Sequence, residues 1–307
     1  MALSVALTIG MLFFVFRGID RETFARLFMT QDRGLLSAAA FFILLQIVFG
    51  GERWRAILSA FASGQSLPML SVQAVFYSSA FFNCLPSGTV GGDVARVWLA
   101  RKFALSVRQL IVSVLLDRII TVGALIILAV ATLPSIKNPL AVTVLFACIT
   151  ILVSGVVGFL LLQPIERLLG RWRNQRLIHL VVRSAEELRF LSRRSGLVSL
   201  VYALVSTSCA VLAAYCIAHS IGIGIGLIQM FAVLSIVIFV AALPISLAGW
   251  GVREISFVAL LGMLGVDREA ALLLSVEFGI IGTLVTLPGV VIWLSLGQHR
   301  KVGLRTN

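Results

Sequence analysis

Long apolar runs alternate with short polar segments along almost the whole chain. A helix needs about 20 mostly apolar residues to cross the hydrocarbon core of a bilayer. Candidate spans lie at residues 1–16, 34–50, 67–85, 108–132, 139–163, 197–218, 227–243 and 275–296. Two further apolar stretches, near 91–102 and 252–264, are too short to cross alone, and each follows a break rich in Pro and Gly. The pattern predicts an all-α, polytopic integral membrane protein with eight full spans and two re-entrant half-helices.

The composition supports a lipid environment for most of the chain. Apolar residues make up 60% of it and charged residues only 12%, with a mean hydropathy of +1.07, whereas soluble domains carry about 25% charged residues. A cytosolic enzyme, a nucleic-acid-binding domain and a disordered scaffold are therefore excluded. The net charge of +12 comes from basic residues at the ends of apolar runs and in one long loop, which is typical of cytoplasmic loops beside anionic lipid head groups.

The basic residues also predict an orientation. The segment 164–196 is rich in Arg, with apolar residues at helical spacing between them, so it is expected to be a cytoplasmic amphipathic loop on the membrane surface. The basic C-terminus is expected on the same side. The short, nearly uncharged loops at 133–138 and 219–226 suit the opposite side, while 17–33 mixes both charges and does not decide the N-terminal side. These features predict a multi-pass protein of the cell (cytoplasmic) membrane.

The two breaks resemble each other. The first, 85–96, reads Leu-Pro-Ser-Gly-Thr-Val-Gly-Gly-Asp-Val-Ala-Arg, and the second, 243–254, reads Leu-Pro-Ile-Ser-Leu-Ala-Gly-Trp-Gly-Val-Arg-Glu. Each leads into a short apolar helix and then a long one, and the predicted orientation makes the two copies run in opposite directions. A single domain, 1–307, with inverted repeat halves 34–132 and 197–296 is typical of transporters that bind their substrate at the bilayer midplane. The alternative is a chance recurrence in an apolar chain rich in Gly.

Non-helical backbone is tolerated within a membrane only where it is buried in protein or lines a wet cavity. The short helices are predicted to begin near Gly92 and Val252, and their positive N-terminal ends would attract an anion such as a lipid phosphate. The residues predicted to contact the head group are Ser87, Gly91, Gly92, Asp93, Arg96, Ser246, Gly249, Trp250, Gly251, Arg253 and Glu254.

Within this set Arg96 and Arg253 are the first choices for binding the anion, because charges within a membrane are functional candidates. Each has an alternative: Arg96 can pair with Asp93 three residues earlier, and Arg253 can extend to the interface. Asp93 and Glu254 are expected to cap their helices. Trp250, between two glycines, is expected to plug or line the cavity.

Three more charged residues lie inside long apolar runs. Asp117 and Arg118 are adjacent, so they do not face each other on a helix and each needs another partner. Glu277 stands alone between apolar neighbours. A buried carboxylate either pairs or stays protonated, so an ion pair with an Arg of the breaks and proton coupling both remain open for these residues.

The segment Arg53-Trp54-Arg55 follows the second apolar run. Arg and Trp at the end of a span anchor it at the interface, and this is the role predicted for them, with a head-group contact as the alternative. The four cysteines have no CxxC spacing and the three histidines form no cluster. No P-loop or HExxH motif is present, so no cofactor, no metal and no catalytic residue is predicted.

Four segments carry a resemblance to a known family. In chain order they are Glu52-Arg53-Trp54-Arg55, the first break, Ser113-Val114-Leu115-Leu116-Asp117-Arg118 and the second break. Together they resemble the lysylphosphatidylglycerol synthase transmembrane-region family, also called the flippase-like membrane domain. The resemblance covers nearly the whole chain. It implies a membrane domain associated with moving aminoacylated phospholipids between leaflets, with Asp93, Arg96, Asp117, Arg253 and Glu254 lining the cavity. Full-length synthases add a soluble aminoacyl-tRNA-dependent transferase domain, for which this chain has no room.

Three functions are compatible with the sequence. The first is a transporter or flippase for the anionic head group of a phospholipid, polyprenyl lipid or glycolipid, whose partner is that lipid. The second is a non-transporting subunit that docks a lipid-modifying enzyme through 164–196. The third is a membrane transferase acting on a polyprenyl-linked substrate with Asp93, Asp117 and Glu254 as its acids, but no metal or nucleotide motif supports it. None of them involves nucleic acid.

Overall fold

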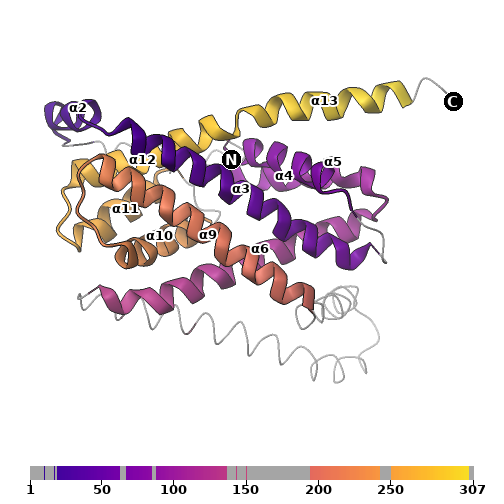
Figure 1. Ribbon diagram of the computed structural model, residues 1–307, viewed down its shortest axis with the longest axis horizontal. Coiled ribbons are helices and arrows are strands. Elements are labelled where there is room, and N and C mark those ends of the chain that lie inside the picture. The colour runs from indigo at the N-terminus through magenta and orange to yellow at the C-terminus, as the bar shows by residue number, and fades with distance from the viewer. Residues whose placement is uncertain are drawn as a thin grey trace.

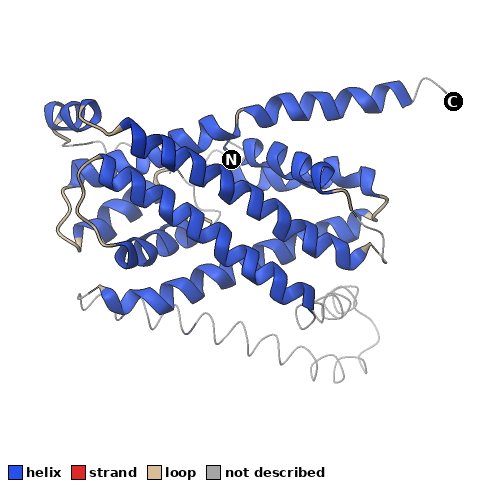
Figure 2. Cartoon of the chain, viewed as in Figure 1, coloured by secondary structure: helices blue, strands red, loops and turns tan. Residues whose placement is uncertain are grey.

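The computed structural model describes residues 19–62, 67–84, 88–136, 194–242 and 250–303, together with positions 10, 17, 143 and 150. These residues form α-helices and short 3-10 turns, with no strand in the part of the chain described (Figure 2). Outside it lie most of the predicted spans 1–16 and 139–163, residues 164–193 of the predicted loop 164–196, and the break residues 85–87 and 243–249.

The helices follow one another in a simple order (Figure 1). They are α2 (Arg21–Met29), α3 (Arg33–Phe61), α4 (Met69–Cys84), α5 (Gly88–Ala100), η1 (Arg101–Phe103), α6 (Val107–Thr132), η2 (Leu133–Ser135), α9 (Arg194–Ser220), α10 (Leu227–Ala241), α11 (Val252–Gly262), α12 (Arg268–Thr286) and α13 (Pro288–Gly303).

Four stretches of the described chain are long and apolar enough to cross a membrane: Arg33–Phe61, Val107–Ser135, Arg194–Ser220 and Arg268–Ser295. The chain is therefore an all-α membrane protein, but eight full spans are not found in the part described. The predicted spans 67–85 and 227–243 correspond to α4 and α10, which have 16 and 15 residues. At about 1.5 Å per residue they reach about 24 Å, short of the roughly 30 Å hydrocarbon core.

Two groups of helices share the same order of a long helix, two shorter helices and a long helix. The first is α3, α4, α5 and α6, and the second is α9, α10, α11 and α12. The first helices of the groups, α3 and α9, pack together along their lengths through the centre of the molecule (Figure 1). They are antiparallel, because the Asp32 N–H donates to the Ser220 carbonyl (3.4 Å) and the Ser206 hydroxyl to the Gln46 carbonyl (3.0 Å).

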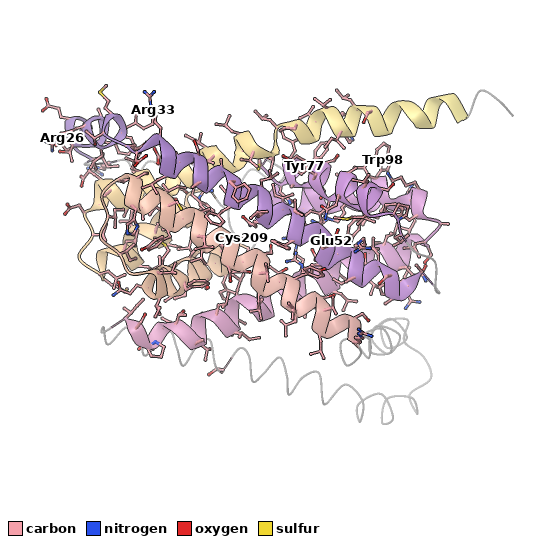
Figure 3. All side chains as sticks on the ribbon, in the orientation of Figure 1. Arg26, Arg33, Glu52, Tyr77, Trp98 and Cys209 are labelled. Atoms are coloured by element: carbon pink, nitrogen blue, oxygen red, sulfur yellow. The ribbon has the colours of Figure 1, made fainter. Side chains whose placement is uncertain are left out.

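Local signals explain several helix boundaries. The Asp32 carboxylate accepts hydrogen bonds from the first N–H groups of α3, and Ser106 with Gln109 forms a capping box at the start of α6. Pro288 separates α12 from α13, where a helix loses an N–H donor. The Tyr77 hydroxyl of α4 donates to the Val285 carbonyl just before this proline. Figure 3 shows Tyr77 close to the first part of α13.

Three predicted boundaries are wrong. The run 34–50 continues as α3 to Phe61, because Glu52 and Arg53 are buried and paired within the protein. The short helix expected near Gly92 begins at Gly88, and the helix expected from 275 begins at Arg268. The second short helix begins at Val252, as predicted.

Candidate functional site

Asp117 of α6 lies at the centre of a buried ion network. One carboxylate oxygen is 2.6 Å from Nε of Arg53 and the other is 2.9 Å from Nη1 of Arg96. All three side chains are almost completely buried. Two arginines from α3 and α5 therefore share one carboxylate, and the pairing of Asp117 with an arginine of the first break is confirmed.

Arg96 is held by aromatic and hydroxyl groups as well. Its Nε donates to the Ser79 hydroxyl of α4 (3.2 Å), and its guanidinium lies over the rings of Phe76 and Trp54, 4.4 and 5.3 Å from their centroids. The Trp54 indole N–H donates to Ser113 of α6 (3.2 Å). These contacts leave Arg96 only 3% exposed, so it faces packed protein.

The neighbouring Arg118 pairs with Asp93 of α5 at 2.8 Å, and both side chains are partly exposed. Asp117 and Arg118 thus have separate partners, as predicted. The expected capping role of Asp93 is wrong, because α5 begins at Gly88 and places Asp93 in its second turn. The alternative pairing of Arg96 with Asp93 is not formed either, since each side chain contacts α6.

The predicted interface anchors are mostly interior residues. Arg53 is buried in the ion network, and Trp54 has no exposed surface, because α3 continues beyond them. Only Arg55 is substantially exposed; it pairs with Glu52 at 2.6 Å. Glu52 also accepts a hydrogen bond from Gln73 of α4 (2.9 Å). Figure 3 places Glu52 on α3 within the helical bundle.

The second break ends in another arrangement of polar groups. The Glu254 carboxylate is completely buried and accepts hydrogen bonds from the Gly251 N–H (2.5 Å) and the Ser275 hydroxyl (3.1 Å). Its predicted capping role is thereby confirmed. Arg253 donates to Glu254 through Nη2 (2.7 Å) and to Ser275 through Nε (3.3 Å). The Arg253 guanidinium lies over the Trp250 ring, 4.6 Å from its centroid.

Arg253 and Trp250 form part of the wall of a pocket of about 220 Å³ between α3, α4, α11 and α12. The α4 wall includes Asn83 and Cys84, which directly precede the first break. Residues beside both breaks therefore meet at one cavity. Arg96 is not among the residues that line it.

The lining residues that sequence reasoning did not single out are Ile43, Gln46, Ile47, Ala80, Asn83, Cys84, Phe278, Gly279, Gly282, Thr283 and Thr286. Most are ordinary residues of apolar helices. The one available signal was the recurrence of Gly and Thr along 279–286, which leaves one face of α12 small and polar.

Asn83 is unusual within the pocket wall. Its Oδ1 is buried and has no hydrogen-bond partner in the described structure. A Cβ at Gly92 would lie 2.0 Å from this oxygen and 2.7 Å from the Ser79 carbonyl, so Gly92 permits the close approach of α5 to α4. Gly91 precedes it within α5, whereas Ser87, Ser246 and Gly249 lie outside the described residues.

Glu277 has no arginine partner among the described residues. One of its oxygens accepts a hydrogen bond from Gln31, and the other is buried without a partner. It does not line the pocket. No group of three His, Cys, Asp or Glu side chains that could hold a metal ion occurs within the segments described.

The helices and the site together define a multi-pass α-helical membrane protein with buried charge pairs and a pocket between two helical groups. The sequence pattern of the lysylphosphatidylglycerol synthase TM region matches residues 1–289. The chain belongs to this family, and its resemblance to the family is thus confirmed. No curated protein matches the chain.

Proposed function

We propose that the protein binds the anionic head group of a membrane lipid in the pocket beside Arg253 and carries it between the leaflets. The observation that carries the proposal is the position of this guanidinium. It stands in the wall of a cavity within an apolar helical bundle, and the described lining contains no carboxylate to oppose an incoming anion.

Three N–H groups of Arg253 are available to such an anion. An arginine has five N–H donors, and Nε and one N–H of Nη2 are used by Glu254 and Ser275. No hydrogen bond joins Nη1 to a described residue. Arginine binds phosphate through two parallel donors, and the remaining groups of Arg253 suit this geometry.

The arrangement of the helices supports a transport role. The two helical groups have the same element order, and α3 and α9 are antiparallel. We propose that the groups are inverted repeat halves, an architecture in which the substrate site lies between the halves. Asn83 and Cys84 of the first group and Arg253 of the second contribute to the same pocket, as this architecture requires.

Leaflet exchange of fluorescent phosphatidylglycerol in proteoliposomes tests the proposal. The protein should accelerate exchange, and Arg253→Gln should slow it about 10- to 100-fold, since a hydrogen bond to a charged group contributes about 1.5–3 kcal/mol. Arg55→Gln is the matched control, because Arg55 is a partly exposed arginine outside the pocket. Absence of exchange across a panel of anionic lipids would refute transport, and equal slowing by both variants would refute the assigned site.

A disulfide can test whether the pocket wall must move. The Cys84 sulfur lies 3.6 Å from the Thr286 hydroxyl across the wall, so Thr286→Cys brings two sulfurs within bonding reach. With the other three cysteines replaced, oxidation should stop exchange and reduction should restore it. Full exchange in the verified disulfide form would show that α4 and α12 need not separate.

A further inference from the structure

The two helical groups contain matching positions with different residues. Ser113 of α6 and Ser275 of α12 each lie in the long helix that follows a short break helix, and each is buried. One helical turn later the first group has Asp117 and the second has Gly279. Both positions contact the arginine of their own break helix.

In the first group the contact is an ion pair, with Arg96 Nη1 2.9 Å from Asp117. In the second group Gly279 has no side chain, and the carboxylate that pairs with Arg253 is Glu254 of the same helix, 2.7 Å from Nη2. A Cβ at Gly279 would lie 2.3 Å from Nη2 and 2.9 Å from Nη1 of Arg253. The guanidinium of Arg253 therefore stands against the backbone of α12, next to the position where a carboxylate stands in the first group.

We infer that the protein has one anion site per chain, in the second group, where the phosphate of a lipid head group binds the N–H groups of Arg253 that Glu254 and Ser275 leave unused. Arg96 is then a structural residue, because it is buried, bonded to Asp117 and Ser79, and absent from the pocket wall. The inference rests on the proposed function in using the same pocket, but it concerns binding and requires no transport step.

Volume and charge limit the ligand that fits. Pockets for drug-sized ligands usually measure about 300–1,000 Å³, so a cavity of about 220 Å³ suits a phosphate with a small substituent. The described lining contains Arg253 but no Asp or Glu, and the nearby Glu254 is buried and already bonded to Gly251, Arg253 and Ser275. An ammonium-bearing aminoacyl head group finds no counterion there.

Substitutions at Gly279 test the inference by adding a carboxylate on the pocket side of Arg253. Gly279→Asp should place a second carboxylate beside Arg253 and compete with the ligand, while Gly279→Asn adds the same volume without the charge. The Cβ contact is with the far end of a flexible side chain, so Arg253 can shift to admit either residue. Dissociation constants would be measured for the detergent-solubilised full chain by native mass spectrometry with phosphatidylglycerol, phosphatidylcholine and inorganic phosphate.

Wild type should bind one phosphatidylglycerol per chain, at least tenfold more tightly than phosphatidylcholine, and Gly279→Asp should bind it at least tenfold more weakly than Gly279→Asn. Displacement of the lipid by inorganic phosphate would assign the site to the free anion; failure of phosphate to compete would assign it to the lipid. Two specific lipids per chain, or equal affinities of the two variants, would overturn the inference. Intact binding without leaflet exchange would overturn only the proposed function.

A substitution of Asn83 tests ligand binding at the same site independently. Its unpartnered Oδ1 is buried beside the pocket and can accept a hydrogen bond from a hydroxyl of a glycerol substituent. Asn83→Ala should therefore weaken binding of phosphatidylglycerol severalfold while leaving the affinity for phosphatidic acid, which lacks that hydroxyl, within twofold. Equal losses for both lipids would limit the inference to the phosphate group and refute a contact with the substituent.

Discussion

Neutralising Asp117 removes the carboxylate that the buried arginines Arg53 and Arg96 share. Removing one partner of a buried ion pair costs about 3–5 kcal/mol, because the other charge stays buried without compensation. Asp117→Asn keeps the size of the side chain and leaves two such charges. We expect it to lower the free energy of unfolding by about 3–5 kcal/mol.

Unfolding by SDS titration in mixed micelles, followed by helical circular dichroism, measures this loss. Asp93→Asn is the control, because its partner Arg118 is 37% exposed and such pairs contribute about 0–1 kcal/mol. Adding Arg96→Met to Asp117→Asn removes one of the stranded charges and should recover part of the loss. A change below about 1 kcal/mol for Asp117→Asn would refute the argument that this network stabilises the fold.

Three further predictions concern the helix boundaries. Tyr77→Phe should lower the free energy of unfolding by about 1–3 kcal/mol, because the Val285 carbonyl loses its hydroxyl donor. Gly289→Ala should cost about 1–3 kcal/mol, since its Cβ would lie 2.8 Å from the Tyr77 carbonyl oxygen; SDS titration measures both. Hydrogen bonds from the Thr23 hydroxyl and the Glu22 N–H lower the pKa of Asp20 below its ordinary value of 3.8. The ionised Asp20 carboxylate therefore caps and stabilises α2 at pH values above 3.8, and this stabilisation is lost as the pH falls through the lowered pKa. Asp20→Ala should therefore speed hydrogen exchange of α2 at pH 7, and an unchanged rate would contradict the cap.

Hydropathy predicted helix boundaries correctly where the helix ends at polar residues. The expected spans 108–132 and 197–218 correspond closely to Val107–Thr132 and Arg194–Ser220. It failed at α3, since a cluster of charges after an apolar run is typical of a membrane interface. The partner of Arg53 is Asp117, 64 positions later, and a local pattern contains no information about that contact.

The part of the candidate site that could be predicted from the sequence consists of residues that are uncommon in apolar helices. An arginine and a tryptophan among glycines drew attention to Arg253 and Trp250, and both line the pocket. Gly279 was missed because its importance comes from the side chain it lacks. The start of α5 was missed as well, because Gly-rich segments have low helix propensity, whereas packing against α4 requires Gly92 within that helix.

Helix α3 contributes residues both to the ion network and to the pocket, so the stability of the network limits which helices can move when the pocket opens. Ile47 and Arg53 of α3 belong to the pocket and the network respectively, six residues or about 9 Å apart along the axis. Separating α3 from α6 would expose buried charges, at several kcal/mol. The contacts of Tyr77 and Cys84 with α12 are uncharged hydrogen bonds, worth about 0.5–1.5 kcal/mol each. A movement that opens the pocket should therefore displace α12 from α4 while α3, α5 and α6 remain together.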